Sequence, residues 1–189
     1  MNYLLNIIFL TLILSTSVPA TPTENIETTY YIIKGSTAKE LRKEMNSKST
    51  MRQDGELFDA FTSWDVNWQF NWNSKNGKCH ITTVSSNLDV TFTLPKWTSR
   101  DKADKNTIKQ WDRYYKALIQ HENGHRDIAV QAAENIEKEI LGLGASSSCK
   151  GLEQKANQIG KKTLNKYIAL EKEYDKKTNH GMKDGAIFP

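Results

Sequence analysis

The sequence predicts an α+β protein in which a small, antiparallel, tryptophan-rich sheet packs on two long antiparallel helices. From Thr62 to Leu94, apolar side chains recur at every second position, which is the spacing of strands with one buried face. From Asp104 onward they recur at steps of three and four, which is the spacing of a helix with one buried face. No linker separates the two halves, so we expect one domain over residues 21–189.

Residues 1–20 are expected to be a signal peptide. They carry no charged side chain, and the apolar run Leu4–Leu14 has about half the length that a transmembrane helix needs. Val18 and Ala20 supply the small residues that signal peptidase prefers, which places cleavage after Ala20. An uncleaved anchor is the alternative. We expect the mature protein to be secreted or periplasmic, with no stable membrane anchor.

The two cysteines, Cys79 and Cys149, are expected to form a disulfide, because oxidising compartments favour the bond. A free catalytic thiol is the alternative, but neither cysteine lies in a nucleophile motif. Closing a loop of about 70 residues stabilises a fold by roughly 4 kcal/mol in the chain-entropy model.

The first half of the mature chain is expected to form strands around one short helix. A capping box at Thr37 and Glu40 begins the helix, and Pro95 ends the last strand. The expected strands are residues 29–34, 62–72 and 78–94, with a helix over residues 37–45 and a turn over residues 74–77.

Tryptophans 64, 68 and 72 share one face of the second expected strand and are expected to fill the core. A stacking platform for sugar or single-stranded nucleic acid is the alternative. The stripe lacks the interleaved lysines and arginines of a nucleic-acid site, so no nucleic-acid partner is expected. The net charge of +4 favours anionic envelope surfaces, although so small an excess discriminates weakly.

The first long helix carries His121-Glu122-Asn123-Gly124-His125, an H-E-x-x-H motif. Histidines four residues apart lie on one side of a helix, where both imidazoles can bind one Zn²⁺ ion. Glu122 is then placed to accept a proton from a zinc-bound water. Two surface histidines in a helical salt bridge are the alternative. Against it, the motif continues the series of apolar positions that is expected to form the buried face of this helix. Glycine is costly inside a helix, so Gly124 indicates a close approach by another backbone.

A catalytic zinc site needs a third protein ligand, which must come from outside this helix. The metzincin extension fails, because it requires histidine where the chain has Gln131. An antiparallel second helix, reached through the loop 142–148, brings its end and the residues beyond it beside the motif. His180 is the expected third ligand, with Glu171 and Asp175 as alternatives. His80 adjoins the expected disulfide and is expected to be structural.

These residues resemble the bacterial DUF922 family, described as secreted zinc-dependent proteases on the strength of the motif itself. The resemblance covers nearly the whole mature chain and implies a zincin-like hydrolase with His121 and His125 as zinc ligands and Glu122 as base. The segments that carry it are 31–35, 40–42, 64–68, 77–79, 93–97, the motif at 121–125, and 174–175 with 178–180 and Gly181.

The function that the sequence predicts is zinc-dependent hydrolysis of a peptide bond, with a peptide or protein as substrate. Tyr174 or Tyr167 is the expected oxyanion donor, and part of Lys78–Leu94 is expected to pair with extended substrate at the edge of a cleft. Two alternatives stay open. One is a secreted envelope-binding module in which zinc is structural or absent, and the other is a zinc amidase acting on peptidoglycan.

Overall fold

The computed structural model describes residues 21–189 apart from residue 54. The expected signal peptide and its cleavage site at Ala20 lie outside the described residues. Within them, no helix combines the length and the hydropathy needed to cross a membrane. The elements in chain order are β1 (Thr23–Ile33), α1 (Ala38–Lys48), β2 (Arg52–Gln53), β3 (Glu56–Leu57), β4 (Phe61–Lys75), β5 (Lys78–Trp97), α2 (Lys105–Leu141) and α3 (Cys149–Thr178), with 3₁₀ turns at Arg100–Lys102 and Met182–Asp184.

Each helix begins at a polar residue whose side chain accepts hydrogen bonds from the free backbone amides of the first turn. Thr37 caps α1 in the expected capping box with Glu40. Asp104 caps α2 by accepting from the amides of Asn106 and Thr107, and Ser148 caps α3. These local signals explain why the helices begin where the sequence predicts.

The main sheet is mixed, with strand order β1-β5-β4. The expected antiparallel pairing holds for β4 and β5, but β1 pairs parallel to β5, from Thr23 opposite Asn87 to Ile33 opposite Trp97. The expectation of a wholly antiparallel sheet is therefore wrong. The reason for the error is physical. Side chains alternate with the same period in parallel and antiparallel sheets, so the alternation carries no information about strand direction.

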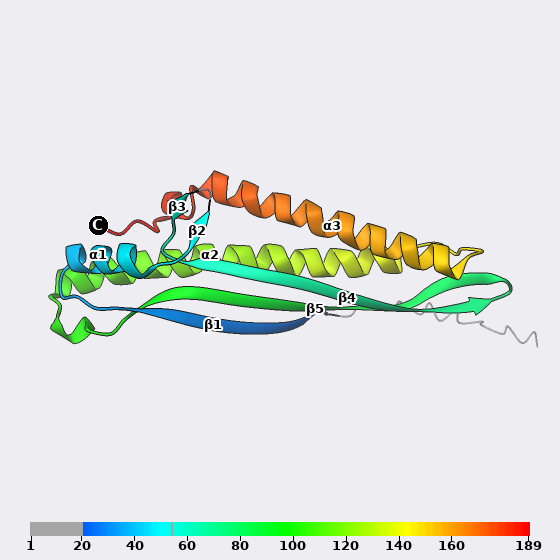
Figure 1. The fold of residues 1–189 in the computed structure, drawn as a ribbon, viewed down its shortest axis with the longest axis horizontal. Coiled ribbons are helices and arrows are strands. Elements are labelled where there is room, and N and C mark those ends of the chain that lie inside the picture. Colours follow the sequence, from blue (N-terminus) through cyan, green and yellow to red (C-terminus); the bar gives the residue numbers. More distant parts are fainter. Residues whose placement is uncertain (1–20, 54) are drawn as a thin grey trace, which may run out of the picture.

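Helix α2 lies between the sheet and α3 (Figure 1). Its buried face contributes Trp111, Tyr114, Leu118 and Ile136 to the core, among other residues. Opposite them, β5 contributes the alternating side chains Leu88, Val90, Phe92 and Leu94, which are all buried. The central strand therefore contributes most of the fully buried side chains on the sheet side of the core, and the tryptophans of β4 lie at its margin.

The tryptophans of β4 connect the sheet to α3. Trp64 and Trp68 are half-buried and pack against the core, whereas Trp72 is 43% exposed, so the expectation that it fills the core is wrong. The Trp68 ring lies so close to Gly160 of α3 that a Cβ at this glycine would come within 2.6 Å of it. Because α3 has a glycine at this position, it can approach the sheet closely.

A disulfide joins Cys79 at the start of β5 to Cys149 at the start of α3, as expected. Cys79 also exchanges backbone hydrogen bonds with Ser146 in the loop before α3. The disulfide therefore anchors the first turn of α3 to the sheet.

Replacing Cys79 and Cys149 together by serine is expected to lower the free energy of unfolding by about 2–5 kcal/mol. The reason is that the bond restricts a long loop in the unfolded chain, with a sequence separation of 70. Urea unfolding of the oxidised wild type and the double variant measures the difference, with reduced wild type as the control. Equal midpoints for the oxidised wild type and the double variant would contradict the expectation.

Candidate metal centre

The H-E-x-x-H motif lies in the middle of α2, on the part of its surface that faces both the sheet and α3. His121 and Glu122 are each 4% exposed and His125 is 6% exposed. Such polar side chains are expensive to bury unless other groups satisfy them. Their burial therefore excludes the alternative of two histidines on a solvated helix face.

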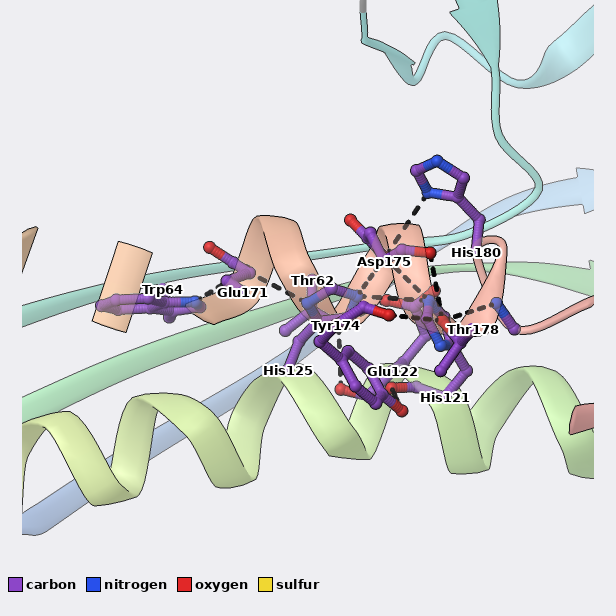
Figure 2. Close-up of polar contacts among 11 residues, drawn as sticks. Thr62, Trp64, His121, Glu122, His125, Glu171, Tyr174, Asp175, Thr178 and His180 are labelled. Atoms are coloured by element: carbon purple, nitrogen blue, oxygen red, sulfur yellow. Dashed lines mark hydrogen bonds and ion pairs between the residues drawn. The ribbon is translucent and has the colours of Figure 1, made fainter. Parts of the chain in front are cut away.

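Helix α3 supplies the third member of a cluster. Asp175 Oδ1 lies 3.2 Å from His121 Nε2 and 3.1 Å from His125 Nε2, and the two Nε2 atoms are 3.2 Å apart. We call these three residues the His–His–Asp cluster. Figure 2 shows Asp175 between the two imidazoles of α2 and the ring of His180.

The spacing of the cluster fits a tetrahedral metal ion. Donor atoms about 2.1 Å from a zinc ion in tetrahedral geometry are roughly 3.4 Å from one another. The separations of the three donor atoms, 3.1 to 3.2 Å, are close to this value. Asp175 Oδ1 is buried and accepts no hydrogen bond from any residue that the structure describes, although both imidazoles are within reach. The donor set and its orphaned oxygen therefore suit a cation bound among the three side chains.

The electrostatics of the cluster agree with a site for positive charge. Burial alone raises the pKa of Asp175, but the imidazoles of His121 and His125 outweigh it and hold this pKa well below its usual range. Burial likewise lowers the pKa of His125, but Asp175 and Glu171 outweigh it and raise this pKa to about 9. The two carboxylates thus stabilise positive charge at the His125 imidazole.

Glu171 and His180 lie next to the cluster, on different sides. Glu171 Oε1 is 3.2 Å from His125 Nδ1 and accepts a hydrogen bond of 2.8 Å from Trp64 Nε1. His180 Nδ1 lies 3.4 Å from Asp175 Oδ1, and its ring packs on Phe58 with centroids 4.5 Å apart. The structure therefore brings Asp175 together with the motif and places the expected third ligand, His180, against that carboxylate.

The Glu122 carboxylate is held by Thr62 at the start of β4. Thr62 Oγ1 donates to Glu122 Oε2 at 2.6 Å, in a buried contact between the sheet and α2. Burial raises the pKa of Glu122, and the Thr62 hydrogen bond opposes that rise. The sequence analysis missed this role. The available signal was that Thr62 is a polar residue in phase with the inward-facing Trp64 and Val66.

Tyr174 positions His121 from the opposite side. Its ring stacks on the imidazole with centroids 5.0 Å apart and an interplanar angle of 13°, and its hydroxyl donates to the His121 carbonyl at 3.3 Å. A Cβ at Gly124 would overlap this hydroxyl. The expected close approach at Gly124 is thus made by a side chain of α3. A Cβ at Gly181, whose φ is 77°, would come within 2.8 Å of the His121 ring.

A cavity of about 720 Å³ adjoins the cluster. His121, Glu122, His125 and Asp175 line it together with His180, so the His–His–Asp cluster and the expected base border the same space. Neither expected oxyanion donor lines this cavity: Tyr174 bonds the His121 carbonyl, and the Tyr167 hydroxyl accepts from Asn135 Nδ2 at 2.8 Å. In this arrangement neither tyrosine is placed to stabilise an oxyanion there.

The segment Lys78–Leu94, part of which was expected to pair with substrate, does not line the cavity. Beside the motif, β5 has no free edge, because its residues 87–97 pair with β1 and its other side pairs with β4. Among the described strands, residues 78–86 pair only with β4, but they lie away from the cavity, so the expectation does not hold at this site. Strand β4 is the edge strand nearest the motif, and its first residues, Phe61 and Thr62, line the cavity. Periodicity gave no information about which strand lies at an edge. His80 is exposed on β5 beside the disulfide and does not line the cavity.

One protein-family model matches most of the chain. The model of a family described as "Bacterial protein of unknown function (DUF922)" matches residues 28–181, a range that contains the whole His–His–Asp cluster and His180. No curated protein and no solved structure matches the chain. The family description assigns no activity, so chemistry has to be argued from the site.

Proposed function

The chain belongs to the DUF922 family, and we propose that it is a zinc-dependent hydrolase that cleaves peptide bonds outside the cytoplasm. One observation carries the proposal. Three donor atoms at the separations of a tetrahedral zinc site share a cavity wall with a buried glutamate from the same helix. A structural zinc site is closed by four protein ligands, whereas a catalytic site has three and an open position. A cluster of three ligands that borders a cavity fits a catalytic site better than a structural one.

The proposed ligands are His121, His125 and Asp175. A zinc ion bound by them supplies a Lewis acid that polarises a carbonyl and makes a water molecule more acidic near neutral pH. We place Asp175 ahead of His180 as third ligand because Asp175 Oδ1 is within 3.2 Å of both motif nitrogens. His180 then supports the site by its contact with Asp175.

Glu122 acts as the general base. Its carboxylate lines the cavity next to the ligands, and the Thr62 hydroxyl holds one of its oxygens at 2.6 Å. This hydrogen bond orients the carboxylate before substrate arrives, and such orientation is what makes proton transfer efficient. Glu171 orients the His125 ring and Tyr174 orients the His121 ring, so both imidazoles are held in position by groups from α3.

The free edge of β4 is the proposed place for the substrate backbone. Within the described part of the chain, β4 pairs only with β5, so the other edge of its backbone is open to an extended peptide. The strand begins at the cavity, beside Glu122, and therefore leads a paired peptide toward the proposed metal position.

The first test is removal and return of the metal. The purified mature protein is expected to contain about one zinc ion per chain and to cleave an unfolded protein substrate. Chelation should abolish cleavage, and added Zn²⁺ should restore it, because the proposed mechanism needs the ion to activate the water and polarise the carbonyl. Metal analysis and mass spectrometry of the products measure both. Cleavage that survives complete loss of zinc would contradict the proposal.

Two other results would assign the site differently. A zinc-loaded protein that leaves proteins intact but cleaves amide bonds in purified peptidoglycan would be an amidase. One that binds envelope polymers and cleaves neither substrate would be a binding module.

A further inference from the structure

Large apolar side chains gather at the cavity that holds the cluster. Phe61 at the start of β4 is 43% exposed, Met182 in the turn after α3 is 46% exposed, and Ile187 is 52% exposed, and all three line the cavity. Apolar surface of this size next to a functional cavity is stabilised when a ligand covers it. Phe61 is far in the sequence from Met182 and Ile187, so the fold brings the start of β4 and the segment after α3 to one cavity.

The segment that carries Ile187 is anchored. The neighbouring Phe188 is buried, with its ring centroid 5.5 Å from that of Trp111 and 5.0 Å from that of Tyr114. Arg42 Nη2 donates to the Phe188 carbonyl at 3.2 Å. Because the backbone at Phe188 is held in this way, the Ile187 side chain is presented at the cavity and does not collapse into the core.

The charges that line the cavity disfavour an acidic ligand side chain. Arg42 is already bound by both carboxylate oxygens of Asp59, at 2.8 and 2.9 Å, and is not free to pair with a ligand. Beyond that pair, the carboxylates of the lining are Glu56, Glu122, Glu171 and Asp175, and the one further lysine or arginine is Lys172. The lining therefore disfavours an acidic group, and the exposed apolar side chains favour an apolar one.

We propose that Phe61, Met182 and Ile187 form a subsite that binds a large, uncharged apolar side chain of an extended peptide, next to the bond that is cleaved. The position relative to the cleaved bond rests on the proposed function, whereas binding of the side chain does not. Loss of one large apolar group from a fitted pocket lowers binding about tenfold or more.

The test is a binding measurement on the zinc-loaded Glu122→Gln protein, which keeps the cavity intact and does not consume the peptide. Fluorescent peptides of one glycine-rich sequence carry phenylalanine, leucine, alanine or aspartate at a single position, and fluorescence anisotropy gives each dissociation constant. The phenylalanine and leucine peptides are expected to bind at least about tenfold more tightly than the alanine peptide, and the aspartate peptide more weakly still. The same series is measured with Ile187→Ser and Phe61→Ser.

The matched control is Ile168→Ser, which removes an apolar side chain that is 38% exposed on α3 and does not line the cavity. The two subsite variants should reduce the preference for phenylalanine over alanine by about threefold or more, and the control should leave it unchanged. Equal binding of the phenylalanine and alanine peptides would overturn the subsite, as would an unchanged preference in both subsite variants. Preferential binding without cleavage by the wild type would refute only the hydrolase. Cleavage at bonds without an apolar neighbour would refute only the subsite.

Discussion

Replacing Glu122 by glutamine will reduce peptide hydrolysis by about 10²–10⁴-fold and leave zinc bound at the wild-type level. Glutamine has the same shape and can still accept the hydrogen bond from Thr62 Oγ1, so the packing between β4 and α2 is retained. It cannot take up a proton, which is the role proposed for Glu122. Turnover of a peptide under saturating conditions, with metal analysis of the same sample, measures both quantities.

Thr62→Val is the matched control for this experiment. It removes the hydroxyl that holds Glu122 but keeps the base, so kcat should fall by only about tenfold, less than in Glu122→Gln. A Glu122→Gln protein that keeps more than about a tenth of the wild-type rate would show that another group takes the proton. Loss of zinc from Glu122→Gln would instead show that Glu122 helps to hold the metal.

Replacing Asp175 by alanine will weaken zinc binding by more than the roughly 10- to 100-fold that loss of a supporting partner costs. Asp175 Oδ1 lies close to both motif nitrogens, and its removal leaves only two donors of the cluster. His180→Ala should stay within that 10- to 100-fold range, because His180 contacts the cluster through Asp175 at 3.4 Å. Competition with a chromophoric chelator measures both affinities.

The order of the two effects identifies the third ligand. Asp175→Asn serves as a control of similar shape that keeps one neutral oxygen, and it should lie between the wild type and Asp175→Ala. If His180→Ala loses more affinity than Asp175→Ala, His180 is the ligand and Asp175 its partner. That result would return the assignment to the one that the sequence alone predicts.

The choice between His180 and Asp175 shows where sequence reasoning stopped. The apolar spacing of the second helix ends at Tyr174, so the sequence predicts that the residues after it lie beyond the helix. The structure continues α3 to Thr178, which places Asp175 one turn beyond Glu171 on the helix. His180 follows in a left-handed turn at φ 51°. Helix ends lack the periodicity that identifies helix middles. Here α3 runs four residues beyond Tyr174, which places Asp175 on the helix and facing the motif.

Features with a local cause were predicted well. The motif, the helix starts and the two helical stripes depend on residues a few positions apart. The disulfide is long-range, but only one pair of cysteines exists. The parallel strand β1 and the edge position of β4 depend on contacts between distant segments, for which alternation gives no signal. For the same reason, Thr62 as the partner of Glu122 emerged only from the folded chain.

Helix α3 is secured at both of its ends by different chemistry. Its first residue is held covalently to β5 through Cys79, and its last turns meet α2 through Asp175 in the proposed zinc form. A reductant would remove only the covalent link at the first end, and a chelator only the proposed metal link at the second. The two ends of α3 are therefore expected to respond to different conditions: the first end to the redox state of the surroundings and the second to their metal content. The proposed metal site thus lies at the end of α3 opposite the disulfide.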